Sequence, residues 1–316
     1  MTWFEALALH AAILVVAVVL DLLLPEPPST IHPVVWIGRS TSGLTRLSPT
    51  GSVAAVAFGL GMVAAVVGTA SVMAWFAMNL LFLIHPAAYV VGGAGLLRTT
   101  FTVAGLKSAA YRTRHELADG CLNAARESLR SLVSRDASTL SRPLVAAAAI
   151  ESVAENTTDS VAGPWLAFAL FGVPGAVAYR AVNTMDSVVG YRGAYEYLGK
   201  AAARLDDLVN LIPARLCALM LLSSGLAARL PVGQGWRVMR RDRNKTASPN
   251  AGWTMSAMAG LLGVQLEKSG HYRLGEGLRD PTPGDIDRAV AILNRTAILV
   301  ALVVLGLLAL RHAIGG

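Results

Sequence analysis

The chain has 316 residues, of which 54% are hydrophobic and only 15% are charged, and its formal net charge is +7 at pH 7. This composition indicates a membrane protein, because several stretches approach the roughly 20 apolar residues that are needed to cross a bilayer. The positive excess is spread through connecting segments without aromatic clustering. It therefore indicates membrane topology and contact with anionic lipid, and it excludes nucleic-acid binding.

The apolar stretches predict an all-α, polytopic helical integral membrane protein that forms one domain over residues 1–316, with about five spans. In chain order, the expected spans cover residues 7–24, 53–84, 86–97, 208–228 and 292–310. Glycines and a His-Pro pair interrupt residues 51–97, so we expect two spans joined by a tight turn there and not one continuous helix.

Two polar segments, near residues 98–160 and 229–291, are expected to form amphipathic helices and loops on the cytoplasmic side. The first of them is rich in arginine, which favours the cytoplasm by the positive-inside rule. Ser141 precedes an Arg-Pro pair and predicts the start of the next helix. If all polar segments face the cytoplasm, either residues 161–177 or residues 208–228 do not cross the membrane, and the sequence leaves both alternatives open.

The first polar cluster lies at the end of that helix. Glu151, Glu155 and Asp159 recur every four residues and share one helical face, with Asn156, a predicted substrate-binding residue, beside them. Like charges at this spacing destabilise an isolated helix, so the face needs a counter-ion. Mg²⁺ is commonly bound through one or two carboxylates plus substrate phosphate. We predict that the three acids are catalytic or bind Mg²⁺; a solvated helix face is the alternative.

The second polar cluster follows an apolar hairpin and contains Arg180, Asn183 and Asp186 on one helical face. A planar, permanently charged guanidinium suits a phosphate or an acyl phosphate, so Arg180 is the predicted phosphate ligand. Asn183 is predicted to orient a reacting carbonyl group, and Asp186 is a further catalytic candidate. The alternative is structural, with Arg180 and Asp186 forming an internal salt bridge.

The run from Glu151 to Tyr191 resembles the signature of the CbiB/CobD family of cobalamin biosynthesis, the adenosylcobinamide-phosphate synthases. Further matching motifs lie in order along almost the whole chain: Asp21, Pro25 and Pro27, then His32 to Gly38, Val133 to Asp136, Ala202 to Leu216 and Ser248 to Leu266. The chain departs from the expected pattern at two positions. Glu26 stands between two prolines where Gly-Asp-Pro is expected, and Thr246 replaces an expected histidine, so the role of either position stays open.

The resemblance implies an ATP-dependent ligase that joins (R)-1-amino-2-propanol phosphate, or free aminopropanol, to a propionate carboxylate of adenosylcobyric acid. The product is adenosylcobinamide phosphate, so the corrinoid is a substrate, ATP is a co-substrate and Mg²⁺ is the implied metal ion. The sequence contains no GxxxxGK[ST] motif, and ATP use therefore rests on the resemblance alone. The implied location is the inner cell membrane, with the active site facing the cytoplasm. A homo-oligomer, or contact with other cobalamin-pathway enzymes, is left open.

The remaining predicted substrate-binding residues are polar groups in loops or at the ends of apolar stretches: His32, Arg39, Asp206, Asp207, Arg215, Ser248 and Asn250. In the first loop, the histidine and the arginine are suited to proton transfer or phosphate contact, and the resemblance at His-Pro-Val favours a functional histidine. Arginines near the Ser-Pro-Asn turn are suited to a phosphate. The alternatives are a structural role for the loop histidine, ordinary interfacial anchoring for the stretch from Ala202 to Leu216, and lipid contact for the arginines near the turn.

Two other classes of function remain as alternatives. In a membrane carrier, the polar clusters would line a transport pathway and the broken apolar segments would be gates, but the chain shows no internal repeat. A non-catalytic membrane sensor of a related superfamily would not be expected to keep catalytic-type motifs. Synthase activity in purified membranes would separate the ligase from both.

Overall fold

The computed structural model describes residues 3–133, 136–191, 193 and 195–315. Apart from one two-stranded hairpin, the described elements are helices, and several are long and apolar. The predicted helical membrane fold is therefore confirmed. Within the motif from Val133 to Asp136, positions 134 and 135 lie outside the described residues.

Four helical stretches are long and apolar enough to cross a membrane, judged by length and composition: Trp3–Leu23, Ser52–Ile84, Arg142–Val189 and Pro283–Ile314. The pair Lys200–Val209 and Leu211–Ala227, bent by 46°, would add a fifth. The expected span at residues 86–97 is wrong, because the helix there has only 13 residues and a span needs about 17 or more.

The chain forms two compact units, and each unit is built from separate stretches of sequence. The first contains Met1–Thr102, Gly163–Val209 and Leu302–Gly316, and the second contains Val103–Ala162 and Asn210–Ala301. This division does not test the predicted single domain, which stays a prediction.

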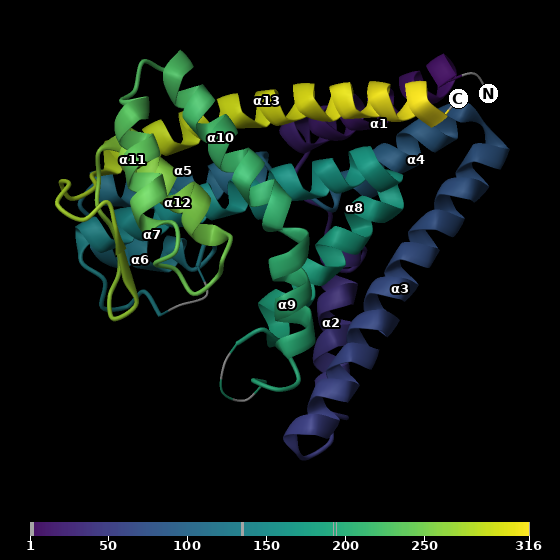
Figure 1. Ribbon diagram of the computed structural model, residues 1–316, viewed down its shortest axis with the longest axis horizontal. Helices are drawn as coiled ribbons and strands as arrows, with labels where there is room; N and C mark the ends of the chain where they lie inside the picture. Colours follow the sequence, from purple (N-terminus) through teal and green to yellow (C-terminus); the bar gives the residue numbers. More distant parts are fainter. Residues whose placement is uncertain (1–2, 134–135, 192, 194, 316) are drawn as a thin grey trace. The chain divides into compact units, whose positions relative to one another are not determined.

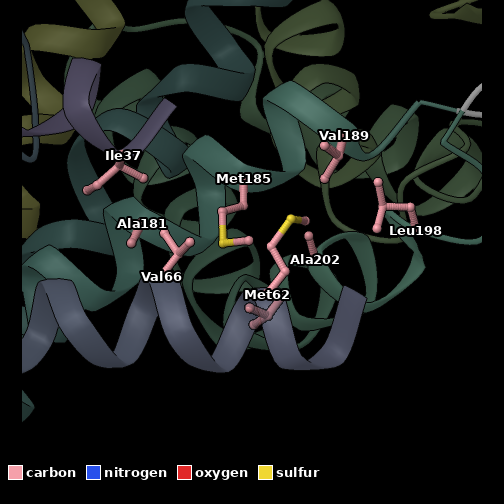
Figure 2. Packing of buried hydrophobic residues seen from close by; sticks show 9 residues of the cluster. Ile37, Met62, Val66, Ala181, Met185, Val189, Leu198 and Ala202 are labelled. Atoms are coloured by element: carbon pink, nitrogen blue, oxygen red, sulfur yellow. The ribbon is translucent and has the colours of Figure 1, made fainter. Parts of the chain in front are cut away.

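The first unit is helical (Figure 1). Its elements are α1 (Trp3–Leu23), α2 (Pro33–Thr45), α3 (Ser52–Ile84), α4 (Pro86–Arg98), α8 (Gly163–Val189), α9 (Lys200–Val209) and the end of α13 (Pro283–Gly315). Helix α3 packs against α4, α8 and α9, and α2 packs against α3 and α8. Figure 2 shows the core between them, in which Met62 of α3 faces Met185 of α8 and Ala202 of α9. A β-carbon at Gly59 would overlap the carbonyl group of Leu198, so glycine allows α3 to come this close.

Helix α8 reverses direction part-way along its length (Figure 1). At the break, Gly172 has φ 71° and ψ −165°, and Pro174 follows two residues later. A glycine tolerates this backbone conformation, and a proline cannot continue a helix through it. On the far side, a β-carbon at Gly175 would lie 2.8 Å from the carbonyl oxygen of Ala167. The apolar hairpin expected between the two polar clusters is present, and residues 161–177 do not form one straight span.

The second unit contains α5 (Ala104–Ala118), α6 (Leu122–Leu129), α7 (Arg142–Thr157), the π-helical turn η1 (Thr158–Ala162), α10 (Leu211–Ala227), α11 (Val232–Asp242), α12 (Ala251–Leu262), β1 (Leu266–Lys268), β2 (Tyr272–Leu274) and most of α13. Helix α7 begins after Ser141, as predicted, and its alanine-rich surface is buried against α5, α6, α12 and β1. Strands β1 and β2 are antiparallel, with Lys268 paired with Tyr272. The hairpin is therefore held against the helix that carries the first polar cluster.

Candidate functional site

A pocket of about 150 Å³ lies beside α7 in the second unit, and we call it the carboxylate pocket. Its polar lining consists of Glu151, Ser152, Glu155, Lys268 and Tyr272. Glu151 is only 4% exposed, whereas Glu155 is half-buried. The two glutamates come from successive turns of α7, and the lysine and tyrosine come from paired positions of the β-hairpin. The predicted helical face is thus a pocket wall for two of its three acids.

Asp159 lies apart from the carboxylate pocket lining because the helix changes its geometry between Glu155 and Asp159. The π turn begins at Thr158, and the α-helical spacing of 100° per residue does not hold beyond that point. In the described residues, no group of three or more His, Cys, Asp or Glu side chains is arranged to hold a metal ion. Two buried or half-buried carboxylates nevertheless fit Mg²⁺ that completes its shell with substrate oxygens and water. That site stays a prediction, centred on Glu151 and Glu155.

Asn156 is engaged in hydrogen bonds along its own helix. Its Nδ2 group donates to the carbonyl oxygen of Ser152 at 3.0 Å and to the Ser152 Oγ at 3.2 Å, while its Oδ1 accepts from the Ser160 Oγ at 2.9 Å. Ser152 in turn donates to the carbonyl oxygen of Leu132 at 2.8 Å. The bond to Leu132 ties α7 to residues 132 and 133, which also line the carboxylate pocket. The predicted substrate contact of Asn156 stays a prediction.

Two arginines contact one tryptophan in the second unit. The Cζ atoms of Arg215 and Arg243 lie 4.8 Å and 4.4 Å from the ring centroid of Trp253. Arg215 also donates from Nη1 to the Asn250 Oδ1 at 3.0 Å. Cation–π contacts of this kind hold a guanidinium in place, and in Arg215 the Nη1 group donates to Asn250 and to the Leu211 carbonyl oxygen, so the Nε and Nη2 groups are the ones suited to an anion. The structure brings Arg215 and Asn250 together as one cluster and adds Arg243, which sequence reasoning did not single out from its basic run.

The turn before α12 explains how this cluster is positioned. The Ser248 Oγ accepts from the backbone N–H of Asn250 at 3.2 Å, and Thr246 donates to the Ser248 carbonyl oxygen at 2.8 Å. A β-carbon at Gly252 would overlap the carbonyl group of Arg243, so glycine lets the two backbones approach. Ser248 and Thr246 therefore stabilise the turn. The substrate contact predicted for Ser248 stays a prediction.

A chain of hydrogen bonds joins α8 to α9 in the first unit. Arg180 donates from Nη1 to the Asn183 Oδ1 at 3.2 Å, and Asn183 donates from Nδ2 to the Asp206 Oδ1 at 3.4 Å. The next residue, Asp207, lies 3.7 Å from Arg204 in an ion pair on α9. Arg180 and Asn183 of the second polar cluster are therefore joined to Asp206, which lies 23 residues after Asn183.

Asp186 lies at the end of the same helical face. A β-carbon at Gly190 would overlap the Asp186 carboxylate, and the Gly190 N–H donates to the Asp186 carbonyl oxygen at 2.7 Å. Glycine at position 190 thus gives the carboxylate the space it occupies. The catalytic role predicted for Asp186 stays a prediction.

His32 caps α2, because its Nδ1 accepts a hydrogen bond from the Val34 N–H at 3.3 Å. Burial lowers the pKa of His32; Glu26 opposes this effect, and the positive charges of Arg180 and Arg98 reinforce it. The imidazole is therefore neutral near pH 7, with its proton on Nε2. The structure brings His32 into the electrostatic range of Arg180, which the sequence did not indicate.

Arg39 is exposed on α2 and has no side-chain hydrogen bond or ion pair within the described part of the chain. The candidate residues thus fall into two sets. His32, Arg39, Arg180, Asn183, Asp186, Asp206 and Asp207 belong to the first unit, and Glu151, Glu155, Asn156, Asp159, Arg215, Ser248 and Asn250 belong to the second.

Comparison with known proteins identifies the family. Residues 14–300 match the family described as "CobD/Cbib protein". The chain belongs to this family. Among its relatives, the "Cobalamin biosynthesis protein CobD" of Dehalococcoides mccartyi is 42% identical over 297 residues, which cover 94% of this chain and 96% of the relative. The "Probable cobalamin biosynthesis protein CobD" of Methanothermobacter thermautotrophicus is 36% identical over 307 residues, covering 95% and 98%.

A third CobD/CbiB family member, the "Cobalamin biosynthesis protein CbiB" of Salmonella typhi, is 36% identical over 291 residues, covering 89% of this chain and 90% of the relative. No solved structure matches the chain. The resemblance noted from the motifs is confirmed, and it extends beyond the motifs to almost the full length.

Proposed function

We propose that the protein is an adenosylcobinamide-phosphate synthase, a membrane ligase of cobalamin biosynthesis. The observation that carries the proposal is the family match over residues 14–300, together with relatives that are named for cobalamin biosynthesis and cover more than nine-tenths of the chain. The substrates are adenosylcobyric acid and (R)-1-amino-2-propanol phosphate or free aminopropanol, and ATP is consumed.

The reaction needs two covalent steps, because a carboxylate is a poor acylating agent at neutral pH. A propionate oxygen of the corrinoid attacks the terminal phosphorus of ATP, which gives an acyl phosphate and ADP. The neutral amine nitrogen then attacks the acyl carbon, and phosphate leaves with the electron pair of the C–O bond. The nitrogen loses one proton to a base, so the amide, inorganic phosphate and a protonated base are the products.

The carboxylate pocket supplies groups for the second step. Glu155 is half-buried and faces the pocket, so it can accept the proton of the ammonium or of the attacking amine. Glu151 and Glu155 would hold Mg²⁺, and a bound ion would neutralise phosphate charge and polarise a phosphoryl oxygen. The two glutamates also provide a negative surface that attracts the positively charged amine.

The other two clusters supply donors for anions and for the reacting carbonyl. Arg180, fixed by Asn183, is our candidate ligand for the phosphate, and the Asn183 amide would orient the carbonyl. In the second unit, Arg215 and Asn250 form a donor set for a phosphate or a corrinoid side-chain amide. His32 and Asp186 are the remaining proton-transfer candidates.

We place the enzyme in the inner cell membrane with its active site facing the cytoplasm, where ATP is available. The arginine-rich segment between α4 and α7 supports this orientation by the positive-inside rule. Contact with other enzymes of the pathway, or a homo-oligomer, would keep the corrinoid intermediate close to the membrane.

The test is product analysis in purified membranes that contain the full chain, supplied with adenosylcobyric acid, ATP and Mg²⁺. Parallel reactions receive the phosphorylated amine, free aminopropanol or no amine. The expected result is a new corrinoid whose mass equals that of the acid plus the amine minus water, formed only when ATP is present. Membranes prepared in the same way without the protein serve as the control. Failure of the folded wild-type protein to form an amide with either amine would overturn the proposal.

A further inference from the structure

A second pocket, of about 320 Å³, adjoins the carboxylate pocket in the second unit, and we call it the hairpin pocket. The charged and aromatic side chains in its lining are Lys245, Glu267, Lys268, His271, Tyr272, Arg273 and Glu276. Lys268 and Tyr272 also line the carboxylate pocket, so this pair of strand residues separates the two spaces. A ligand that reaches from one space to the other would contact this pair of residues.

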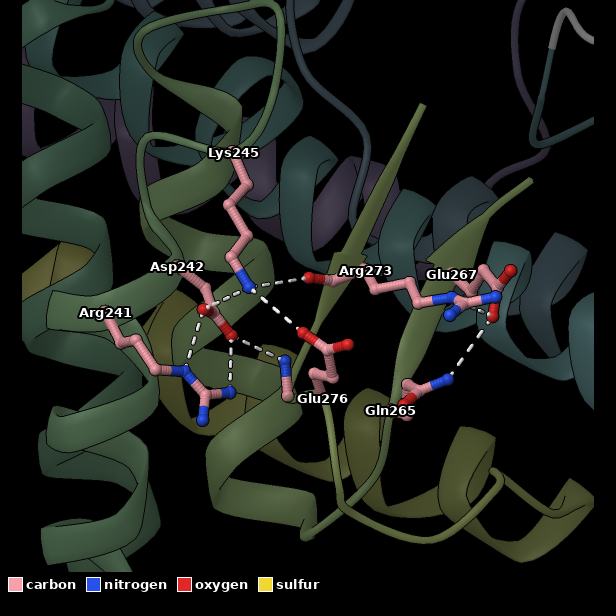
Figure 3. A network of polar contacts seen from close by, with 8 residues as sticks. Arg241, Asp242, Lys245, Gln265, Glu267, Arg273 and Glu276 are labelled. Carbon is pink, nitrogen blue, oxygen red and sulfur yellow. Dashed lines mark hydrogen bonds and ion pairs between the residues drawn. The ribbon is translucent and has the colours of Figure 1, made fainter. Parts of the chain in front are cut away.

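Two of the basic side chains that line the hairpin pocket, Lys245 and Arg273, are paired with carboxylates (Figure 3). Lys245 lies 2.8 Å from Asp242 and 3.8 Å from Glu276, and Arg273 lies 3.0 Å from Glu267. For Lys268, the described residues provide no hydrogen bond or ion pair to the ammonium group. A half-buried lysine without an ion pair among the described residues, at the junction of two pockets, is suited to an anionic ligand whose own charge is offset beside Glu151 and Glu155 of the same lining.

The hairpin that carries Lys268 is held firmly in place. At its base, the Asp242 Oδ2 accepts from the backbone N–H of Gly275 at 2.7 Å, and Lys245 donates to the Arg273 carbonyl oxygen at 3.3 Å. Asp242 is fully buried and also accepts two hydrogen bonds from Arg241, each 2.8 Å long. On the other side, β1 packs against α7. Lys268 is therefore presented to the carboxylate pocket by fixed elements.

We propose that Lys268 binds a substrate phosphate group at the junction of the two pockets, in a site that no Walker A motif would have revealed. The inference rests on the proposed function, which requires ATP and uses an amine phosphate. Either could supply the phosphate, as the polyphosphate of a nucleoside triphosphate or as the phosphate of the amine.

The geometry favours the polyphosphate. The hairpin pocket lies in the size range of pockets that hold drug-sized ligands, which is larger than a single phosphate requires. A chain of phosphates passing Lys268 would bring its terminal phosphorus next to Glu151 and Glu155, where the implied Mg²⁺ would offset the like charges. An amine phosphate, in contrast, would place its phosphate at Lys268 and its ammonium between the glutamates.

The test compares Lys268→Gln with Lys268→Arg, and it uses Lys107→Gln as the control because that variant removes the same charge from α5 of the same unit. Calorimetric titration of the full chain in detergent measures binding of inorganic tripolyphosphate and of Mg²⁺-ATP. Lys268→Gln should weaken tripolyphosphate binding by about tenfold or more, the value of one charged hydrogen bond, whereas Lys107→Gln should bind like wild type. Lys268→Arg should recover most of the affinity. Thermal unfolding of each variant confirms that it is folded.

Kinetic constants then separate the two sources. A Lys268→Gln enzyme with a raised KM for ATP, and an unchanged KM for free aminopropanol, supports the nucleotide. If KM rises for aminopropanol phosphate but not for ATP or free aminopropanol, the amine supplies the phosphate. Wild-type binding and wild-type KM values in folded Lys268→Gln would overturn the inference, even with the synthase active. Conversely, Lys268-dependent tripolyphosphate binding in a chain without synthase activity would support the phosphate site while rejecting the proposed function.

Discussion

Gly163 lies against the ring of Tyr179 across the hairpin of α8. A β-carbon at position 163 would overlap the Cζ and Oη atoms of the tyrosine, whose side chain is only 5% exposed. Because Tyr179 directly precedes Arg180, this contact also fixes the start of the second polar cluster. The close approach explains why a glycine occurs here in the middle of a long helical stretch.

Replacing this glycine should therefore destabilise the fold. We expect Gly163→Ala to lower the free energy of unfolding by about 1–3 kcal/mol, because the tyrosine ring or one arm of the hairpin must move. Gly306→Ala is the matched control, since no atom lies within 4 Å of a β-carbon there and alanine favours a helix. Thermal unfolding in detergent should rank Gly163→Ala well below wild type and Gly306→Ala at or above it. Equal stability of the two variants would show that the contact is unimportant.

The free energy of unfolding of the second unit should fall in acid, because ionised Asp242 stabilises the fold. Burial alone would raise the pKa of Asp242, but hydrogen bonds from Arg241, Lys245 and the Gly275 N–H outweigh it and hold the pKa at about 2. The unfolded chain has the ordinary, higher value, so the stabilisation is complete above about pH 4 and is lost as the pH falls towards 2.

The corresponding measurement is unfolding of the wild type and of Asp242→Asn across that pH range. Near neutral pH, Asp242→Asn should be less stable by about 1–3 kcal/mol, because it removes hydrogen bonds to charged donors, and the difference should disappear near pH 2. Asp280→Asn, an exposed position, should match wild type throughout. A pH-independent difference would contradict the assignment of the lowered pKa.

Two substitutions of His32 can separate its role as the N-cap of α2 from its proposed role in proton transfer or substrate contact. Asparagine is also a good N-cap, whereas alanine is not, so His32→Ala should cost about 1 kcal/mol of stability and His32→Asn much less. Because the folded state has the lower pKa, the cap of the wild type should hold above about pH 6.5 and weaken as the pH falls through that lowered pKa. Loss of synthase activity in stable His32→Asn would support proton transfer or substrate contact. Full activity there would leave His32 as a cap alone.

The sequence predicts this site wherever the relevant contacts are local. Glu151 and Glu155 lie one turn of α7 apart, and this spacing is enough to place both on one pocket wall. Asp159 departs from that wall because a π turn intervenes, and hydrophobic periodicity does not indicate where such a turn begins. Spans are predictable from composition, but the 13-residue length of α4 depends on the break at His85-Pro86 and on tertiary packing.

Long-range contacts account for what the sequence did not reveal. Lys268 lines the same pocket as the glutamates of α7 only because a hairpin more than 100 residues later packs against that helix. Arg243 likewise contacts Trp253 through a turn whose close approach needs Gly252. Neither residue has a local pattern that distinguishes it from the neighbouring basic residues. The family motifs mark these regions, but they do not show which side chains meet.

Glu155→Gln tests the carboxylate pocket directly. The substitution keeps the shape of the side chain and removes its charge, so the fold should be unaffected. If Glu155 accepts a proton from the amine, turnover should fall on the order of 10²-fold or more. A shifted Mg²⁺ requirement would add metal contact to its role. Steady-state kinetics with varied Mg²⁺ provide both readouts, and Glu127→Gln, an exposed residue of α6, is the control. Wild-type turnover with an unchanged Mg²⁺ dependence would remove Glu155 from the mechanism.

The last prediction concerns Arg180, for which a phosphate contact and a structural role have different kinetic consequences. Lysine keeps the charge but loses the planar fork, and it cannot reproduce the bond from Nη1 to the Asn183 Oδ1. If Arg180 binds the phosphate of the amine, Arg180→Lys should raise KM for aminopropanol phosphate by about tenfold or more while leaving KM for free aminopropanol nearly unchanged.

A structural role would affect both amines alike, because the hydrogen bonds from Arg180 through Asn183 to Asp206 join α8 to α9. In that case Arg180→Lys should lower the unfolding temperature, and Asn183→Ala should lower it too. Either variant should then change KM for the two amines to the same extent. Equal kinetic effects on the two amines in a stable Arg180→Lys protein would reject the phosphate contact. A selective effect on the phosphorylated amine would instead place its phosphate at the first unit's cluster, and Lys268 would then be expected to contact the nucleotide.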